Sequence, residues 1–229
     1  MHEILRGLLD AARLLAAGSA ELWGIIGLSL RVTGMALLLC TLIGVPLGAA
    51  LGLLRLRTRG LITALLYTGM GLPPVVVGLF VYLLLSRSGP LGALGWLFTP
   101  RAMVTAQTII AFPLVTGLTL TAVRGVDPAF RQQVRSLGAT RLQEIAALLK
   151  EARLGVVAAV VAAFGSIISE VGAVMLVGGN IEGRTRVLTT AIVLDTRQGE
   201  FIPAIALGVI LLLLAFLANV VLLRLQGKN

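Results

Sequence analysis

Long apolar stretches separated by short polar segments are the dominant pattern along this chain. A helix needs about 20 apolar residues to cross the hydrocarbon layer of a bilayer. Backbone N–H and C=O groups inside lipid must bond to one another, so each such stretch is predicted to be a helix. The pattern predicts spans at residues 23–54, 60–86, 102–123, 154–178 and 201–223.

The segment before the first span has a different pattern. In residues 1–22, Arg6, Asp10 and Arg13 fall on one helical face, and apolar residues such as Leu8 fall on the other. This spacing is typical of an amphipathic helix that lies on a membrane surface. The same charges interrupt the apolar run that a cleaved signal peptide requires. We therefore expect an interfacial helix at the start of a single transmembrane domain that covers residues 1–229.

The longest polar segment, residues 124–153, predicts two short helices. Asp127 followed by a proline is a favourable helix start. Gly138 is typical of the position just past a helix end. Thr140, with Gln143 three positions later, makes a capping box for a second helix.

Each of these two helices has a short apolar edge. The edge residues are Val134 and Leu137 in the first helix, and Leu142, Ile145, Ala146 and Leu149 in the second. The spacing alone fits two interpretations equally well. The segment is either a surface helix pair without a special role or an element that inserts into a groove of a partner protein.

Composition and charge support the membrane assignment. Of the 229 residues, 58% are hydrophobic and 13% are charged, and the mean hydropathy is +1.01. A soluble domain carries about 25% charged residues. The net charge of +9 comes from basic residues in loops rather than from a basic face with interleaved aromatic residues, which excludes nucleic-acid binding. Basic residues are more frequent after the first and third spans and in the tail, so we expect the N-terminus outside and the C-terminus in the cytoplasm.

The chain carries few residues suited to catalysis or metal binding. Cys40 is the only cysteine and His2 the only histidine. An intrachain disulfide is therefore excluded, and no metal site built from His and Cys is expected. The sequence has no G-x-x-x-x-G-K-[ST] phosphate-binding loop and no apparent nucleophile–base pair. Catalysis is therefore expected in a separate polypeptide.

The stretch QQVRSLGAT at residues 132–140 resembles the "EAA" loop of type I ABC importer permeases. In that loop, a Glu-Ala-Ala sequence precedes a glycine. Here Gln132, Gln133 and Val134 occupy the three positions, and Lys150 stands where a later proline is usual. The resemblance implies a coupling helix that sits in a cleft of an ATPase subunit. Its residues would be Gln132, Gln133, Val134, Arg135, Ser136, Leu137, Gly138, Ala139 and Thr140.

The resemblance extends over residues 25–225. SLRVTGMALLLCTLIGVPLGAALGLLR at residues 29–55 is similar to the first core helix of these permeases, and GLPPVVVGLFVYLLLSRSGPLG at residues 71–92 resembles tungstate- and molybdate-type members. SEVGAVMLVGGNIEGRTRVLTTAIVLDTRQGEF at residues 169–201 resembles the tungstate-uptake subfamily in particular. The resemblance implies an all-α integral membrane protein with the five-helix core of type I ABC importer permeases.

The resemblance also implies a function and a set of partners. The chain would be the permease subunit of an ATP-driven importer for tungstate in the cytoplasmic (inner) membrane. Two copies would form a homodimer with two cytoplasmic ABC ATPase subunits, and an extracellular or periplasmic oxyanion-binding protein would deliver the anion. The permease would be non-catalytic and bind no cofactor, because the ATPase would use the ATP and Mg.

Several alternatives remain. Molybdate, sulfate or another anion as cargo is the main one. A secondary transporter would show inverted repeats and charged residues at the midplane. An intramembrane enzyme or signalling protein would show a catalytic pair or a soluble output domain. The sequence shows none of these features.

A second set of residues is predicted to line the translocation pathway or its gate. Glu170 is the only carboxylate inside a predicted span, and such residues face protein or a water-filled cavity. It is expected either to have a structural or gating role, or simply to reach external water or cap backbone amides. The glycine- and arginine-rich loop after it either holds an oxyanion briefly or forms a plain turn. Two prolines are expected to kink the second span, as a packing kink or a gate hinge. The full set is Pro73, Pro74, Ser169, Glu170, Gly178, Gly179, Asn180, Arg184 and Arg186.

Overall fold

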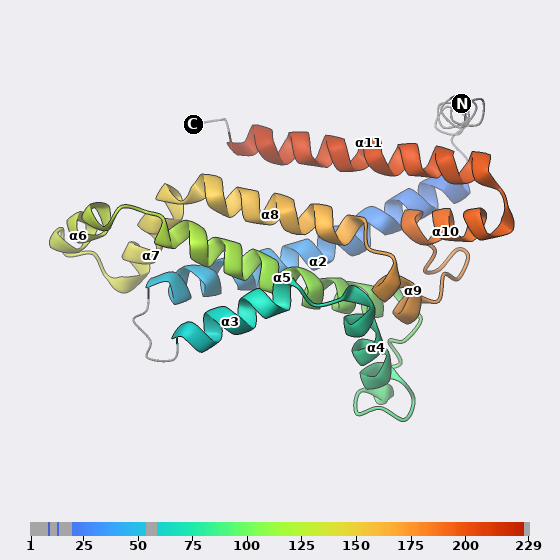
Figure 1. Cartoon of the computed structure of the whole chain (residues 1–229), viewed down its shortest axis with the longest axis horizontal. Coiled ribbons are helices and arrows are strands. Elements are labelled where there is room, and N and C mark those ends of the chain that lie inside the picture. The colour runs from blue at the N-terminus through green and yellow to red at the C-terminus, as the bar shows by residue number, and fades with distance from the viewer. Residues whose placement is uncertain (1–8, 10–12, 14–19, 54–58, 227–229) are drawn as a thin grey trace. The chain divides into compact units, whose positions relative to one another are not determined.

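The computed structural model describes residues 9, 13, 20–53 and 59–226 of the chain. These residues form helices connected by turns and short loops, and no strand occurs among them (Figure 1). The predicted all-α fold is therefore confirmed. The predicted interfacial helix at residues 1–22 lies outside the described residues, apart from positions 9, 13 and 20–22.

Three of the described helices are long and apolar enough to cross a membrane. They are α2 (Ala20–Leu53), α5 (Pro100–Arg124) and α11 (Phe201–Gln226), the last of these over Phe201–Val221. Their positions agree with the first, third and fifth apolar stretches, because uninterrupted apolar sequence over about 20 residues favours a spanning helix.

The other two apolar stretches contain breaks. The stretch at residues 60–86 forms α3 (Arg59–Met70) and α4 (Pro74–Leu85), which are bent by 96° relative to each other. The bend is larger than a proline kink because Pro73 is the N-cap of α4 and Pro74 its first residue, so the two prolines start a new helix.

The fourth stretch also divides into two helices. It forms α8 (Arg153–Ile168) and, after a break at residues 169–171, the short helix α9 (Gly172–Gly178). At its other end, α8 is bent by 73° relative to α7 (Arg141–Glu151). Within the described residues the chain thus has three spans, or up to five if each of the two bent pairs, α3–α4 and α7–α8, counts as one.

The chain packs into two compact units, and α2, α5, α8 and α11 contribute residues to both. In its described part, unit 1 contains the residues up to Met35 together with Pro73–Gln107 and Ile167–Val220. Unit 2 contains Ala36–Leu72 and Thr108–Ser166, followed by the end of α11 from Val221 onward.

In unit 1, α4 packs against α9 through small residues. A Cβ atom placed on Gly78 would lie 2.6 Å from Ala173 Cα, and one placed on Gly172 would lie 2.5 Å from Val75 Cγ2. The two backbones therefore approach as closely as glycine permits. The loop that follows α4 contains the short 3-10 helix η1 (Gly92–Leu94).

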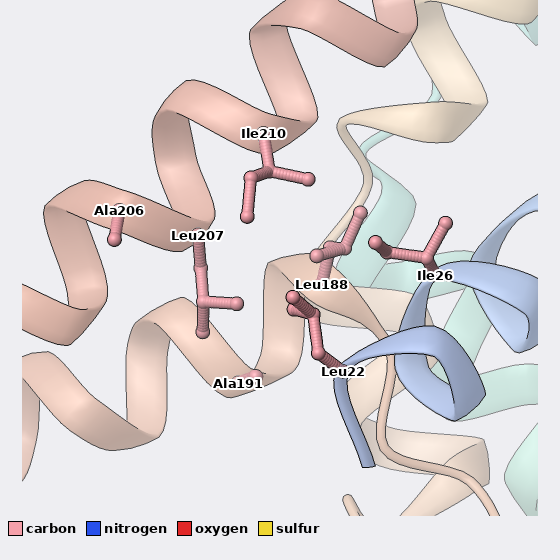
Figure 2. Packing of buried hydrophobic residues seen from close by; sticks show 7 residues of the cluster. All are labelled: Leu22, Ile26, Leu188, Ala191, Ala206, Leu207 and Ile210. Carbon is pink, nitrogen blue, oxygen red and sulfur yellow. The ribbon is translucent and has the colours of Figure 1, made fainter. Parts of the chain in front are cut away.

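An apolar cluster in unit 1 joins the start of α2 to α10 (Leu188–Gln198) and to α11. Figure 2 shows side chains from these three helices pointing toward one another. The cluster consists of Leu22, Ile26, Leu188, Ala191, Ala206, Leu207 and Ile210. It holds the chain segment that follows α9 against the first and last spanning helices.

In unit 2, α2 packs against α5 through glycines spaced four residues apart. Gly44, Gly48 and Gly52 all face α5. A Cβ atom on Gly48 would overlap the Thr116 carbonyl oxygen and lie 2.9 Å from Thr119 Cβ. Small residues at this spacing let two helices in a membrane approach closely.

Candidate functional site

The predicted coupling segment folds as two short helices whose ends match the sequence signals. α6 (Pro128–Ser136) begins after Asp127, whose Oδ1 accepts a hydrogen bond from a first-turn amide at 2.8 Å. Gly138 follows the end of α6 with a φ of +77°, a left-handed conformation that favours glycine. Thr140 and Gln143 form the predicted capping box at the start of α7. The helix–glycine–helix arrangement is thus confirmed.

The junction between α6 and α7, residues 132–142, forms an exposed tip. Leu137 and Leu142 are 81% and 80% exposed. Val134 and Ala139 are half-buried. The exposed members of the predicted coupling set are Gln132, Gln133, Arg135, Ser136, Leu137, Gly138 and Thr140. The tip therefore presents two large apolar side chains on a polar surface, where a partner protein can bury them.

The opposite side of this segment is buried against the helices of unit 2. Leu148 of α7 is 2% exposed and forms a cluster with Ala49 of α2, Val123 of α5 and Ala152. Phe130 of α6 packs on the same cluster. The buried sides of α6 and α7 thus pack on two spanning helices, and the tip remains exposed.

The predicted apolar stripe of α7 has two different surroundings. Ile145 and Leu149 pack on the buried cluster. Leu142 and Ala146 are exposed instead. The most buried apolar position is Leu148, which clusters with residues of α2 and α5 and was not part of the predicted stripe.

A buried carboxylate connects α6, α7 and α2. Glu144 is 5% exposed, and its Oε1 accepts hydrogen bonds from Arg131 Nε at 2.7 Å and from Arg135 Nε at 3.0 Å. Arg131 Nη2 also donates to the backbone oxygen of Leu53, at the end of α2, at 2.9 Å. We call Arg131, Arg135 and Glu144 the clasp.

Electrostatics keep the carboxylate of the clasp ionised. Burial by itself raises the pKa of Glu144. The hydrogen bonds and positive charges of Arg131 and Arg135 outweigh burial, so the pKa lies below its ordinary value of 4.5. Sequence analysis missed the roles of Glu144 and Arg131. The available signal was the i, i+4 spacing of the two arginines on α6, but nothing local indicated an acceptor on α7.

Glu170, the predicted pathway carboxylate, caps a helix at the break between α8 and α9. Its Oε1 accepts a hydrogen bond from the Ala173 amide at 2.9 Å. Two other side chains satisfy carbonyl groups at the break. Gln107 Nε2 donates to the Ile167 oxygen at 2.8 Å, and Thr189 Oγ1 donates to the Glu170 oxygen at 3.0 Å. A broken helix inside a membrane requires such substitutes for the lost helical bonds. Gln107 and Thr189 were missed, although both are polar residues in largely apolar sequence.

The other predicted pathway residues near this break lie in two places. The first turn of α4, which begins at Pro74 directly after Pro73, contacts the first turn of α9 through Val75 and Gly172. The structure therefore brings the proline junction close to Glu170. Ser169 is exposed at the end of α8.

The loop after α9 is built around one buried threonine. Gly179 and Asn180 have φ values of +73° and +50°, so the chain reverses sharply after Gly178. Thr185 is fully buried, and its Oγ1 donates to the Gly178 oxygen at 2.6 Å and accepts from the Ile181 amide at 2.9 Å. Sequence analysis missed the role of Thr185, because its partners are defined by the shape of the loop.

The two arginines of this loop have different surroundings. Arg184 is exposed. Arg186 Nη1 lies 3.4 Å from a carboxylate oxygen of Glu182 and 3.9 Å from one of Glu21. These carboxylates offset part of the positive charge of Arg186, which weakens its attraction for an anion. Arg184 is the better placed of the two to meet a charged partner.

Metal binding has no support within the described residues, where no group of three or more His, Cys, Asp or Glu side chains is arranged to hold an ion. Cys40 is buried, and its thiol donates to the Thr108 oxygen at 3.2 Å. This contact fits a packing role for the cysteine.

Comparison with known proteins finds one matching family for residues 44–228, which is described as the binding-protein-dependent transport system inner membrane component. The chain belongs to this family. The matched range contains the tip, the clasp, the break between α3 and α4 and the break between α8 and α9. Membership in this family confirms the resemblance to importer permeases and makes the chain a multi-pass membrane component of a transport system.

Individual relatives are similar over most of the chain. A tungstate uptake system permease protein of Peptoclostridium acidaminophilum is 40% identical over 228 residues, which is 100% of both chains. A probable anion ABC transporter permease protein of Haloferax volcanii is 42% identical over 210 residues, or 90% of each chain. A molybdenum transport system permease protein of Escherichia coli is 30% identical over 209 residues, covering 84% of this chain and 91% of that one.

Proposed function

We propose that this inner membrane component imports an oxyanion, tungstate in the first place, with ATP hydrolysed on a separate subunit. The tungstate-uptake permease that is similar over 100% of both chains supports this cargo. Molybdate is the second candidate, because a molybdenum permease is also similar over most of the chain, at the lower identity of 30%.

The observation that carries the proposal is the tip. It is a short helix, a left-handed glycine and a second capped helix, with Leu137 and Leu142 exposed at the end. A groove on an ATPase subunit would bury these two leucines. The ATPase would bind one conformation of the permease tightly and the other weakly. Nucleotide-driven motion of the ATPase would then shift the equilibrium between the two permease conformations.

The assembly that this mechanism needs contains more than one chain. The described residues contain three to five spans, which are few to enclose a pathway, so we place the route between two copies of the chain. A binding protein outside the cell would deliver the anion, and the tip would lie in the cytoplasm. This orientation puts the N-terminus outside and the C-terminus inside, as the distribution of basic residues predicts.

The structure favours a structural role for the predicted gate residues. Glu170 stabilises the start of α9 through the Ala173 amide. Because α9 contacts α4, a change in this cap would alter the position of the proline junction as well. We therefore place Glu170 in the hinge region of the pathway rather than in contact with the anion, which its negative charge would repel.

Transport in reconstituted vesicles tests the proposal. The chain would be co-reconstituted with its ATPase, and the binding protein would be added outside with labelled tungstate. We expect uptake that requires ATP and the binding protein, and that unlabelled tungstate suppresses more strongly than molybdate or sulfate. Vesicles without the ATPase are the control. Uptake driven by an ion gradient without ATP would instead establish a secondary transporter, and molybdate as the stronger competitor would reassign the cargo.

A further inference from the structure

The clasp is the most completely defined polar contact that the proposed function does not already use. Glu144 is buried, and the side chains of Arg131 and Arg135 are 29% and 57% exposed. Both arginines belong to α6, the glutamate belongs to α7, and Arg131 reaches the end of α2 as well. Three helices of unit 2 therefore meet at one carboxylate and one guanidinium group.

We propose that Arg131 and Glu144 are positioning residues that make α6 and the inner end of α2 move as one body, so that displacement of the tip enters a spanning helix directly. This inference rests on the proposed function, because it assumes that an ATPase displaces the tip. It adds a route by which the displacement travels and names residues outside the coupling set of residues 132–140.

The geometry of Arg131 is the first argument. Its guanidinium group is planar and presents donors in fixed directions. Nε is directed at Glu144 and Nη2 at the Leu53 oxygen, at 2.7 Å and 2.9 Å. The last carbonyl groups of a helix have no partner within that helix. Arg131 supplies one to α2, and α6 cannot shift along α2 without breaking this bond.

The surrounding packing is the second argument. Leu148 clusters with residues of α2 and α5, and Phe130 packs on this cluster; such apolar contact is non-directional. Such contacts hold α6 near the membrane but allow it to slide or rotate. A carboxylate that accepts from two arginines of the same helix also fixes the rotation of α6 about its own axis, since Arg131 and Arg135 lie four residues apart on one face.

The cost of burying a charge is the third argument. A buried ion pair commonly gives less stability than apolar residues of similar size, and fixing one arrangement among several is the use for which such pairs are best attested. The clasp lies beside an apolar cluster that already holds the helices together. Its presence there indicates a requirement for one defined orientation of α6.

The test uses the reconstituted importer and measures anion taken up per ATP hydrolysed. The variants are Glu144→Gln, Arg131→Gln, the double variant and Arg131→Lys. The last keeps the positive charge but not the planar fork that reaches two acceptors. Glu151→Gln is the matched control, because Glu151 is an exposed carboxylate at the end of the same helix.

The expected result separates coupling from docking. Each single variant should retain the ATPase on co-purification and still hydrolyse ATP. Uptake per ATP should fall about tenfold, within the range typical of coupling between two sites. Uptake per ATP in the double variant should be no lower than in the less active of the two single variants. Two residues that act as one unit lose their function together, so the second substitution removes nothing more. The control should match the wild type. If Glu144→Gln does not yield folded protein, Arg131→Lys gives the decisive comparison.

Three outcomes would overturn the inference. Unchanged uptake per ATP would show that the clasp transmits nothing. Independent, multiplicative losses in the double variant would show that the two residues do not act together. Loss of ATPase binding would make the clasp part of the docking surface. In all three cases the wild type still imports the anion. Failure of the proposed function is different, because ATP-driven uptake would then be missing from the wild type itself.

Discussion

Replacing Gly48 by alanine should destabilise the packing of α2 against α5 more than the same change at any other glycine of α2. The added Cβ would overlap the Thr116 carbonyl oxygen and lie 2.9 Å from Thr119 Cβ. A backbone oxygen in the middle of a helix cannot rotate away as a side chain can. The two helices must therefore separate locally, which also loosens the contacts at Gly44 and Gly52.

The magnitude follows from two opposing effects. Overpacking a well-packed interface costs about 1–3 kcal/mol, and contact with a backbone atom belongs at the upper end. Alanine is favoured over glycine inside a helix by about 1 kcal/mol. We therefore expect Gly48→Ala to lower the free energy of unfolding by about 2 kcal/mol, and each 1.4 kcal/mol is tenfold in an equilibrium constant.

The same helix provides a graded series of controls. A Cβ on Gly44 would meet the Thr116 Oγ1 atom at 2.9 Å, and one on Gly52 would meet Val123 Cγ1 at 3.2 Å. Both contacts are with side chains that can give way, so the losses should be smaller. A Cβ on Gly34 has no heavy atom within 4 Å, and Gly34→Ala should be neutral or slightly stabilising.

The differences in the free energy of unfolding can be measured by reversible unfolding in mixed micelles. Denaturing detergent is titrated in, and tryptophan fluorescence follows the transition. We expect the order Gly48, Gly44, Gly52 and Gly34 from the most to the least destabilising substitution. An equal loss at Gly34 and Gly48 would refute it, because the effect would then come from the glycine backbone and not from the approach of the two helices.

Three further predictions concern polar contacts. The folded pKa of Glu144 is lowered from 4.5, so the stability that the clasp contributes is present above that pH and is lost as the pH falls through the folded pKa. The protection factors of the α6 amides, which correct for the intrinsic pH dependence of exchange, should therefore hold down to that range, and a loss of protection near neutral pH would contradict it. Glu170→Ala should speed exchange in the first turn of α9 about fivefold, since a helix cap contributes about 1 kcal/mol. Glu170→Gln, which keeps an oxygen to accept from the Ala173 amide, should not, and equal exchange in the two variants would exclude the cap. Thr185→Val should lower the free energy of unfolding by about 1–3 kcal/mol, because the Gly178 oxygen loses a buried donor. Thr185→Ser keeps the hydroxyl and should retain most of this stability in the same unfolding titration. A valine variant as stable as the wild type would exclude this role of Thr185.

Signals between neighbouring residues were read correctly from the sequence. The start of α6 after Asp127, the left-handed glycine at Gly138 just past its end and the capping box at Thr140 each depend on atoms only a few residues apart. The three uninterrupted spans depend on continuous apolar sequence and were read equally well. The sharp bend before α4 was underestimated. Tandem prolines indicate an interruption, but the 96° angle also depends on the packing of α4 against α9.

The contacts that sequence analysis missed have a common physical origin. Arg131 donates to the Leu53 oxygen across 78 positions of the chain, and Gln107 donates to the Ile167 oxygen across 60. In each case a side chain from a distant segment satisfies a carbonyl group at the end of a helix. A membrane makes this need compulsory, since water is not available to satisfy exposed backbone groups. The sequence therefore predicts that every break or helix end inside the membrane has a polar partner. The identity of that partner depends on how distant helices pack. The first candidates are the polar residues of otherwise apolar helices.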